Sequence, residues 1–329
     1  MNHRPSKPSE SQNLLSDILG EAEKSKVKLT PEIDRYIRSH LEAAQEKLER
    51  GEKLTHADLA FMEKAREMIE LERFKQVELA PQYGKRLETL ATFDFIESPK
   101  NPVIKGIDKK KYPAPTLEQI MAKVTPEKAE LIKKYIKKPL LLIVPFAMPL
   151  KTIKTRAGQK KGRLDQKPVS GGASYINSDL PNLGKGESKL FYFPENYDQA
   201  AHGGLSKSEV LESETHNAFP GWQVLVVDGT ETVPKDTLNK LPHTLKAEFD
   251  ALGLGGLTPE DWLTLHIEGA LKGIPFDDAR SHSINWNLAS YEEGGCVPNA
   301  HWETEWAYLS GDSPEDRGPS AGARRAVRL

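Results

Sequence analysis

Near its C-terminus the chain reads Ser283-Ile-Asn-Trp-Asn-Leu288, Val297-Pro-Asn-Ala-His-Trp302, Trp306-Ala-Tyr-Leu309 and Arg324-Arg-Ala-Val-Arg-Leu329. Each piece places apolar or aromatic residues next to polar ones over a short length, and turns rich in Gly, Pro, Asp and Ser separate the pieces. We therefore expect these pieces to be short strands joined by turns.

Upstream of this tail the sequence predicts longer buried strands and two helices. Leu140–Phe146 is a continuous apolar run bounded by prolines, and Lys189–Phe193 and Trp222–Val227 have a similar apolar character. We expect all three to be strands. One helix should cover roughly Lys235–Leu252, and a second should begin at Thr258, which precedes a proline and two acids. The basic stretch 151–167 is predicted to be a loop.

The first 138 residues are rich in Glu, Lys, Leu and Ala, whereas all five tryptophans lie in the last third of the chain. Thr30-Pro31-Glu32 is typical of a helix start, and an apolar stripe follows it at three- and four-residue spacing. Thr55 with Asp58 resembles a capping box for a second helix, and Thr125-Pro126-Glu127 should start a third. Residues 98–115 hold several prolines and are predicted to be a linker or loop. The first two helices should pack as a hairpin.

Composition excludes several classes of protein. The formal net charge of −2 over 329 residues gives no bulk reason to expect a nucleic-acid partner. A single cysteine, Cys296, excludes an intramolecular disulfide framework and a cysteine-rich zinc site. No apolar run reaches the ~20 residues of a membrane helix, and no secretory signal is recognisable. We expect no membrane insertion and a cytoplasmic location, with export by a signal-less route left open.

Residues that could carry catalysis each have a structural explanation. Gly253-Leu-Gly255-Gly256 lacks the third glycine of a dinucleotide-binding loop and is interpreted as a turn. The nine histidines show no metal-binding spacing, and His266 is expected to be a core residue. Cys296 has no obvious catalytic partner. Glu303 and Glu305 should share one face of a strand, opposite Trp302 and Trp306, which suits a recognition surface or a solvated face. We predict no enzyme activity, cofactor or metal.

A series of short segments lies along the chain from residue 139 onward: Pro139–Pro145, Leu190–Pro194, Gly221–Val227, Gly256–Leu263, Asn285–Leu288, Val297-Pro298 with Trp302, Ala307–Leu309 and Gly322–Leu329. In this order they resemble segments of the target proteins of diversity-generating retroelements, particularly those from uncultivated small-celled bacteria. The final segment, Gly322–Leu329, is the strongest part of the resemblance.

The resemblance implies an α+β chain with a C-type lectin-like domain over residues 139–329, preceded by an α-helical region over residues 1–138. This fold is also that of formylglycine-generating enzymes, whose paired active-site cysteines are missing here. Val297-Pro298-Asn299 and Asn285-Trp286-Asn287 depart from the calcium triplets of carbohydrate-binding lectins, so calcium-dependent sugar binding is not expected.

In that family, codons for solvent-facing residues on the last strands and loops are rewritten while the apolar scaffold is kept. The variable surface would lie within about residues 281–329. The residues predicted to bind ligand are Asn285, Asn299, His301, Glu303, Glu305, Tyr308, Ser310, Asp312, Asp316 and Arg317.

The sequence thus favours a non-enzymatic ligand-binding protein with a diversified recognition surface, whose partner is an unknown protein or surface ligand. The alternative is a structural or assembly protein that forms homo-oligomers through its N-terminal helices.

Overall fold

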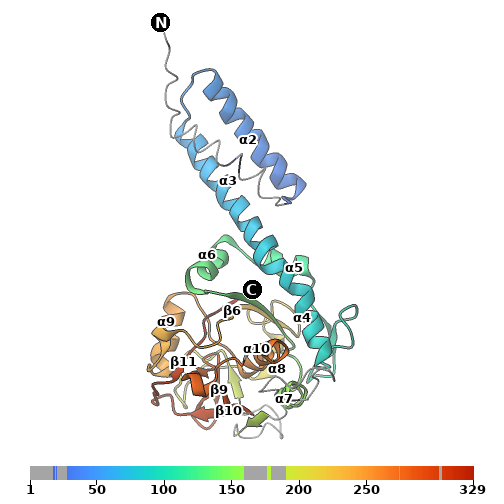
Figure 1. Cartoon of the computed structure of the whole chain (residues 1–329), viewed down its shortest axis with the longest axis vertical. Helices are drawn as coiled ribbons and strands as arrows, with labels where there is room; N and C mark the ends of the chain where they lie inside the picture. The colour runs from blue at the N-terminus through green and yellow to red at the C-terminus, as the bar shows by residue number, and fades with distance from the viewer. Residues whose placement is uncertain are drawn as a thin grey trace. The chain divides into compact units, whose positions relative to one another are not determined.

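The structure, a computed structural model, describes residues 18, 20, 28–158, 176–178, 190–273, 275–303 and 306–329. It divides into two compact units, one made of residues 1–81 and 124–129 and the other of residues 82–123 and 130–329. Helices and several small sheets together confirm the α+β class (Figure 1). The larger unit includes residues 82–123, which the sequence analysis assigned to the N-terminal region.

The smaller unit contains the predicted helical hairpin, formed by α2 (Pro31–Glu49) and α3 (His56–Phe74). Thr30 accepts a hydrogen bond from the Ile33 amide, and Thr55 and Asp58 form the predicted capping box. A π-helical turn and α4 (Ala80–Thr92) continue the chain. The facing apolar stripes of the hairpin exclude water from a small core. This core contains Ile18, Ile37, Leu41, Met62, Ala65 and Ile69.

In the larger unit, two of the three predicted apolar strands form a three-stranded antiparallel sheet with the last strand of the tail, whereas the strand predicted at Lys189–Phe193 lies in a different sheet. β6 (Gln223–Asp228) lies at its centre, between β3 (Pro139–Val144) and the C-terminal strand β12 (Ala326–Arg328). Every residue of β6 is buried, as are all residues of β3 after Pro139. The continuous apolar run therefore marked a strand covered on both faces.

The short strands of the tail belong mainly to a second sheet, with the order β11-β7-β9-β10-β4. β9 and β10 form an antiparallel pair, whereas β10 runs parallel to β4 and β11 runs parallel to β7. β5 and β8 pair separately. The strands are β4 (Ile176–Ser178), β5 (Leu190–Tyr192), β7 (Ile284–Trp286), β8 (Ser290–Glu292), β9 (Val297–Glu303), β10 (Trp306–Asp312) and β11 (Ala321–Gly322).

The central helix α10 (Pro259–Lys272) starts as its sequence predicts. Thr258 and Asp261 form a capping box, Pro259 occupies the first turn, and Gly273 ends the helix in a left-handed conformation at φ 70°. Residues 259–269 are buried on every side, as expected for a helix enclosed by other elements. α10 packs against β3, β9 and α7 (Leu150–Ala157).

Two segments predicted to be loops contain regular structure. The region 98–115 holds an antiparallel pair, β1 (Val103–Lys105) and β2 (Lys111–Pro113). The prolines do not interrupt this pairing, since they lie outside the two strands or at the end of β2. The first part of the stretch 151–167 belongs to α7, since Leu150, Ile153 and Ala157 form a buried stripe. Residues 159–167 lie outside the described part of the chain.

The predicted helix at 235–252 is also divided. A 3₁₀ turn covers Lys235–Thr237, and α9 (Pro242–Ala251) begins only at its proline, which favours the first turn of a helix. α6 (Pro126–Tyr135) starts where Thr125-Pro126 predicted it. Two short helices, α5 (Leu117–Ala122) and α8 (Lys207–Glu212), were not predicted; each has its own capping box.

The core of the larger unit is built on aromatic residues. Trp222, Trp262, Trp286 and Trp302 are each at most 2% exposed. His266 lies between Trp262 and Trp302, with ring centroids 5.3 and 5.5 Å away, so it is a core residue as predicted. None of the helices in the described ranges combines the length and apolar character needed to span a bilayer.

Replacing Trp302 with alanine should lower the free energy of unfolding by about 3–5 kcal/mol, because the change leaves a large cavity under β9. Urea unfolding followed by far-UV circular dichroism measures this loss. Leu271→Ala is the matched control: Leu271 is 43% exposed, so its truncation should cost about 0.5 kcal/mol or less. Equal effects of the two substitutions would contradict this description of the core.

Candidate ligand-binding surface

β9 and β10 present two chemically different faces. Ala300 and Trp302 on β9, and Ala307 and Leu309 on β10, are fully buried. Successive side chains on a strand point to opposite faces, so the residues between them share the other face. There the side chains of His301, Tyr308 and Ser310 are partly exposed and that of Asp312 is exposed. The strand pair therefore holds polar groups at the surface on an apolar base.

His301 and Tyr308 form an aromatic pair across the two strands. They are directly opposite each other in the register, and their rings stack at a centroid separation of 5.2 Å and an angle of 8°. This pair presents flat, partly exposed rings with polar atoms. Such groups supply contact area at low cost in conformational entropy.

A chain of hydrogen bonds continues along the same face. Ser310 Oγ donates to Asn299 Oδ1 at 2.9 Å, and Asn299 Nδ2 donates to Asp312 Oδ2 at 2.6 Å. Asn299 itself is 2% exposed, so its predicted place on the ligand-binding surface is corrected. Its amide is occupied by its two neighbours, and it therefore positions Ser310 and Asp312 from below.

Asn285 is a second correction. It is fully buried on β7, where its side chain donates to Asn287 Oδ1 at 2.8 Å and accepts from the backbone amide of Arg324 at 2.8 Å. A polar residue type suggested exposure, but β7 lies between β11 and β9, and the side chain holds two segments together. Asn285 therefore stabilises the scaffold.

Two of the remaining predicted residues follow β10. Asp316 and Arg317 are exposed in the connection that follows β10. Glu303 lies at the end of β9, but its side chain, like all of Glu305 and the side chain of Trp306, is outside the described part of the structure.

Sequence reasoning missed an acidic cluster under β10. Glu292 on β8 is 5% exposed, and burial together with the nearby Asp312 carboxylate raises the pKa of Glu292 to about 7. A Cβ added at Gly311 would collide with the Glu292 carboxyl, so these two residues are in close contact. Glu293, the neighbouring acid in the sequence, is exposed, and the acid that interacts with Glu292 is Asp312, which is distant in sequence.

Cys296 adjoins this cluster. Burial, followed by the charges of Glu292, Asp312 and Asp316, raises the pKa of its thiol. A thiolate is the reactive form of cysteine, so this environment disfavours nucleophilic chemistry. Burial and Asp316 also raise the pKa of Asp312.

The other candidates for chemistry are engaged elsewhere. Asp277 is fully buried and paired with Arg324, and Asp278 is paired with Arg280. Burial lowers the pKa of His266 to about 4, so its ring is neutral near pH 7. In the part of the chain that the structure describes, no group of three His, Cys, Asp or Glu residues is placed to hold a metal ion.

The base of the surface is fixed by Arg324. Its guanidinium bonds both oxygens of Asp277, at 2.9 and 2.6 Å, and the carbonyls of Asp228, Thr230 and Glu231 at 2.7–3.0 Å. Trp262 Nε1 and Ser283 Oγ also donate to Asp277 at 3.0 Å. These contacts join α10, β6 and the last strands into one rigid support.

Glu292→Gln should increase stability at neutral and alkaline pH. Because the folded-state pKa of about 7 exceeds the ordinary value of 4.5, the native state favours protonated Glu292. Wild-type stability should fall, by up to about 3 kcal/mol, as the pH rises from 4.5 past 7. The glutamine side chain cannot ionise, so the variant should not lose stability in this way. The unfolding free energies of the variant and the wild type should therefore differ little below pH 4.5 and increasingly as the pH rises past 7.

Urea unfolding at a series of pH values between 4 and about 8.5 measures the difference. Glu293→Gln, at the exposed neighbouring position, is the matched control for removal of one acidic charge. A stability difference between wild type and Glu292→Gln that stays constant with pH would contradict the perturbed titration.

The chain matches no protein-family model, no curated protein and no solved structure.

Proposed function

We propose that this chain is a non-enzymatic ligand-binding protein in which the polar face of β9 and β10 is a diversified recognition surface on a C-type lectin-like scaffold. The separation of the two faces carries the proposal. Ala300, Trp302, Ala307 and Leu309 point to one face, where they are fully buried, and His301, Tyr308, Ser310 and Asp312 occupy the other.

Such a surface can change its chemistry without a change of fold. Substitutions of exposed side chains away from the core are usually nearly neutral for stability. A rigid base also limits the entropy lost when a ligand binds. The ligand would be a protein or another surface ligand, recognised by aromatic rings, a hydroxyl and carboxylates.

The resemblance to retroelement targets supports the same proposal. The quoted segment Gly322–Leu329 contains Arg324, which holds the base of the surface together, and β12, which completes the three-stranded sheet. The other quoted segments include much of β3, β6 and the start of α10, which form the scaffold rather than the polar face.

Two display libraries test the proposal. One randomises His301, Tyr308, Ser310 and Asp312; the matched library randomises the buried Ala300, Trp302, Ala307 and Leu309 on the same strands. We expect most members of the first library to resist protease as the parent does, and most members of the second to be degraded. Selection of the first library on a panel of unrelated proteins should yield binders. Equal losses of folded members, or no binders from a folded first library, would contradict the proposal.

A second candidate function is assembly through the helical hairpin, and an exposed aromatic cluster favours it. Tyr36 is 47% exposed, and its ring lies 4.6 Å from that of His40 and 5.4 Å from that of Phe61. These residues give α2 and α3 an apolar, partly uncovered patch that a second copy of the chain could bury.

For this candidate, sedimentation velocity of the full chain should show an increase in mass with concentration, and Tyr36→Ser should shift the protein toward the monomer. Val77→Ser is the control, because Val77 is a similarly exposed apolar residue of the same unit, at 55%. A monomer at all concentrations, or equal effects of the two substitutions, would rule out assembly through this patch.

A further inference from the structure

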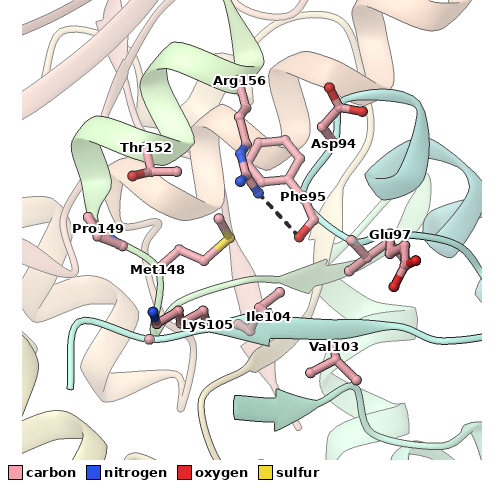
Figure 2. Close-up of a pocket in the computed structure, with 12 residues that line it drawn as sticks. Asp94, Phe95, Glu97, Val103, Ile104, Lys105, Met148, Pro149, Thr152 and Arg156 are labelled. Carbon is pink, nitrogen blue, oxygen red and sulfur yellow. Dashed lines mark hydrogen bonds between the residues drawn. The ribbon is translucent and has the colours of Figure 1, made fainter. Parts of the chain in front are cut away.

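A cavity of about 700 Å³ lies in the larger unit, away from the residues of the β9–β10 surface. It is open to solvent and is lined by α7, by the segment 94–97 that follows α4, by β1 with Gly106, and by Met148 and Pro149 (Figure 2). This volume falls within the range of about 300–1,000 Å³ that small-molecule sites occupy.

One part of the cavity wall is apolar. Phe95, Ile104 and Met148 are each at most 3% exposed, and all three line the cavity. They come from three separate segments of the chain, which Figure 2 shows converging below α7. These three side chains form the floor of the cavity, and the partly exposed Val103 and Pro149 add apolar surface that the hydrocarbon part of a ligand can contact.

Arg156 provides a cation that the described protein residues leave almost unused. Its side chain points from α7 toward Phe95, and its one hydrogen bond within the described part of the chain runs from Nη1 to the Phe95 carbonyl at 3.5 Å (Figure 2). A guanidinium has five N–H donors, and 3.5 Å is long for a hydrogen bond. Burial also lowers the pKa of Arg156. The charge is thus partly removed from water without a strong acceptor, which is unfavourable until an anion binds.

Two further donors line the same cavity. Thr152 lies four residues before Arg156, so the two side chains share one face of α7. Lys105 extends from β1 and is exposed. Among the described residues, neither the Thr152 hydroxyl nor Lys105 Nζ has a hydrogen-bonding or ion-pair partner.

Two acids also line the cavity, but neither neutralises Arg156. Glu97 accepts a hydrogen bond from Asn101 Nδ2 at 3.4 Å, and Asp94 has an interaction of its own. In Figure 2 the Glu97 carboxylate points away from the guanidinium, and the dashed line from Arg156 runs to Phe95 rather than to either acid. The cavity therefore combines apolar lining residues with hydrogen-bond donors, on Arg156, Thr152 and Lys105, that no described carboxylate binds.

We propose that this cavity binds a small organic carboxylate. The carboxylate would accept hydrogen bonds from Arg156 and Thr152, and the apolar body would lie against Phe95, Ile104 and Met148. Planar guanidinium groups match carboxylates through paired, charge-assisted hydrogen bonds. The apolar wall selects such a ligand over inorganic phosphate, which has no hydrocarbon part. The site is independent of the β9–β10 surface and of its proposed function.

Isothermal titration calorimetry of the full chain with phenylacetate and with hexanoate tests the site. At least one of these probes should bind, and the neutral amides of the same acids and inorganic phosphate should bind at least about tenfold more weakly. Arg156→Gln should weaken binding by at least about tenfold, and Thr152→Val should weaken it several-fold. Lys151→Gln removes a charge from an exposed position of the same helix and should leave the affinity unchanged.

Far-UV circular dichroism establishes that each variant is folded. Arg156→Lys keeps the charge but loses the paired geometry, so it should retain part of the affinity even if the glutamine variant is unstable. Several results would overturn the proposal: no binding of either acid, equal binding of acid and amide, tighter binding of phosphate, or equal effects of Arg156→Gln and Lys151→Gln.

Discussion

The buried ion pair between Arg324 and Asp277 joins the parts on which the rest of the larger unit depends. Two buried charges repay the cost of leaving water only when their remaining hydrogen-bonding groups are satisfied. Here three backbone carbonyls, Trp262 and Ser283 complete the shell around the pair. Loss of either partner would leave an unpaired charge in the core. The contacts of the pair tie the end of the chain to β6 and α10. None of these contacts involves the exposed side chains of β9 and β10.

In this arrangement, the residues that stabilise the fold are largely different from those proposed to bind a ligand. The buried side chains of β9 and β10 pack on the tryptophan core. The polar side chains contact mainly one another, through the His301–Tyr308 stack and the Ser310–Asn299–Asp312 hydrogen bonds. A second buried pair, Lys207 with Glu260 at 2.8 Å, joins α8 to α10, and Tyr192 donates to the same carboxylate at 2.6 Å. The scaffold is thus held largely by contacts that do not involve the exposed side chains of His301 and Tyr308.

Local signals predicted much of the fold. Thr30, Thr55 and Thr258 start helices as their capping patterns indicate, because a cap depends on residues within one turn. The strands β3 and β6 followed from their unbroken apolar character. The region 98–115 was misread because short strands that contain lysine and proline have little apolar periodicity, and their pairing is not visible in either strand alone.

The candidate surface was predicted only in part, for a related reason. His301, Tyr308, Ser310 and Asp312 have the expected alternation, but Asn285 and Asn299 are buried, since residue type indicates polarity and not position in a sheet. The contacts of Arg324 with Asp277 and of Glu292 with Asp312 join residues far apart in sequence, and only the folded chain brings them together.

Deep sequencing of codons 281–329 in the source population tests the central claim most directly. The account predicts variation concentrated at His301, Tyr308, Ser310 and Asp312, with Trp286, Trp302, Leu309 and Arg324 constant and a near-copy of these codons elsewhere in the same genome. An invariant tail without a near-copy, or variation that falls equally on the buried residues, would contradict a diversified recognition surface.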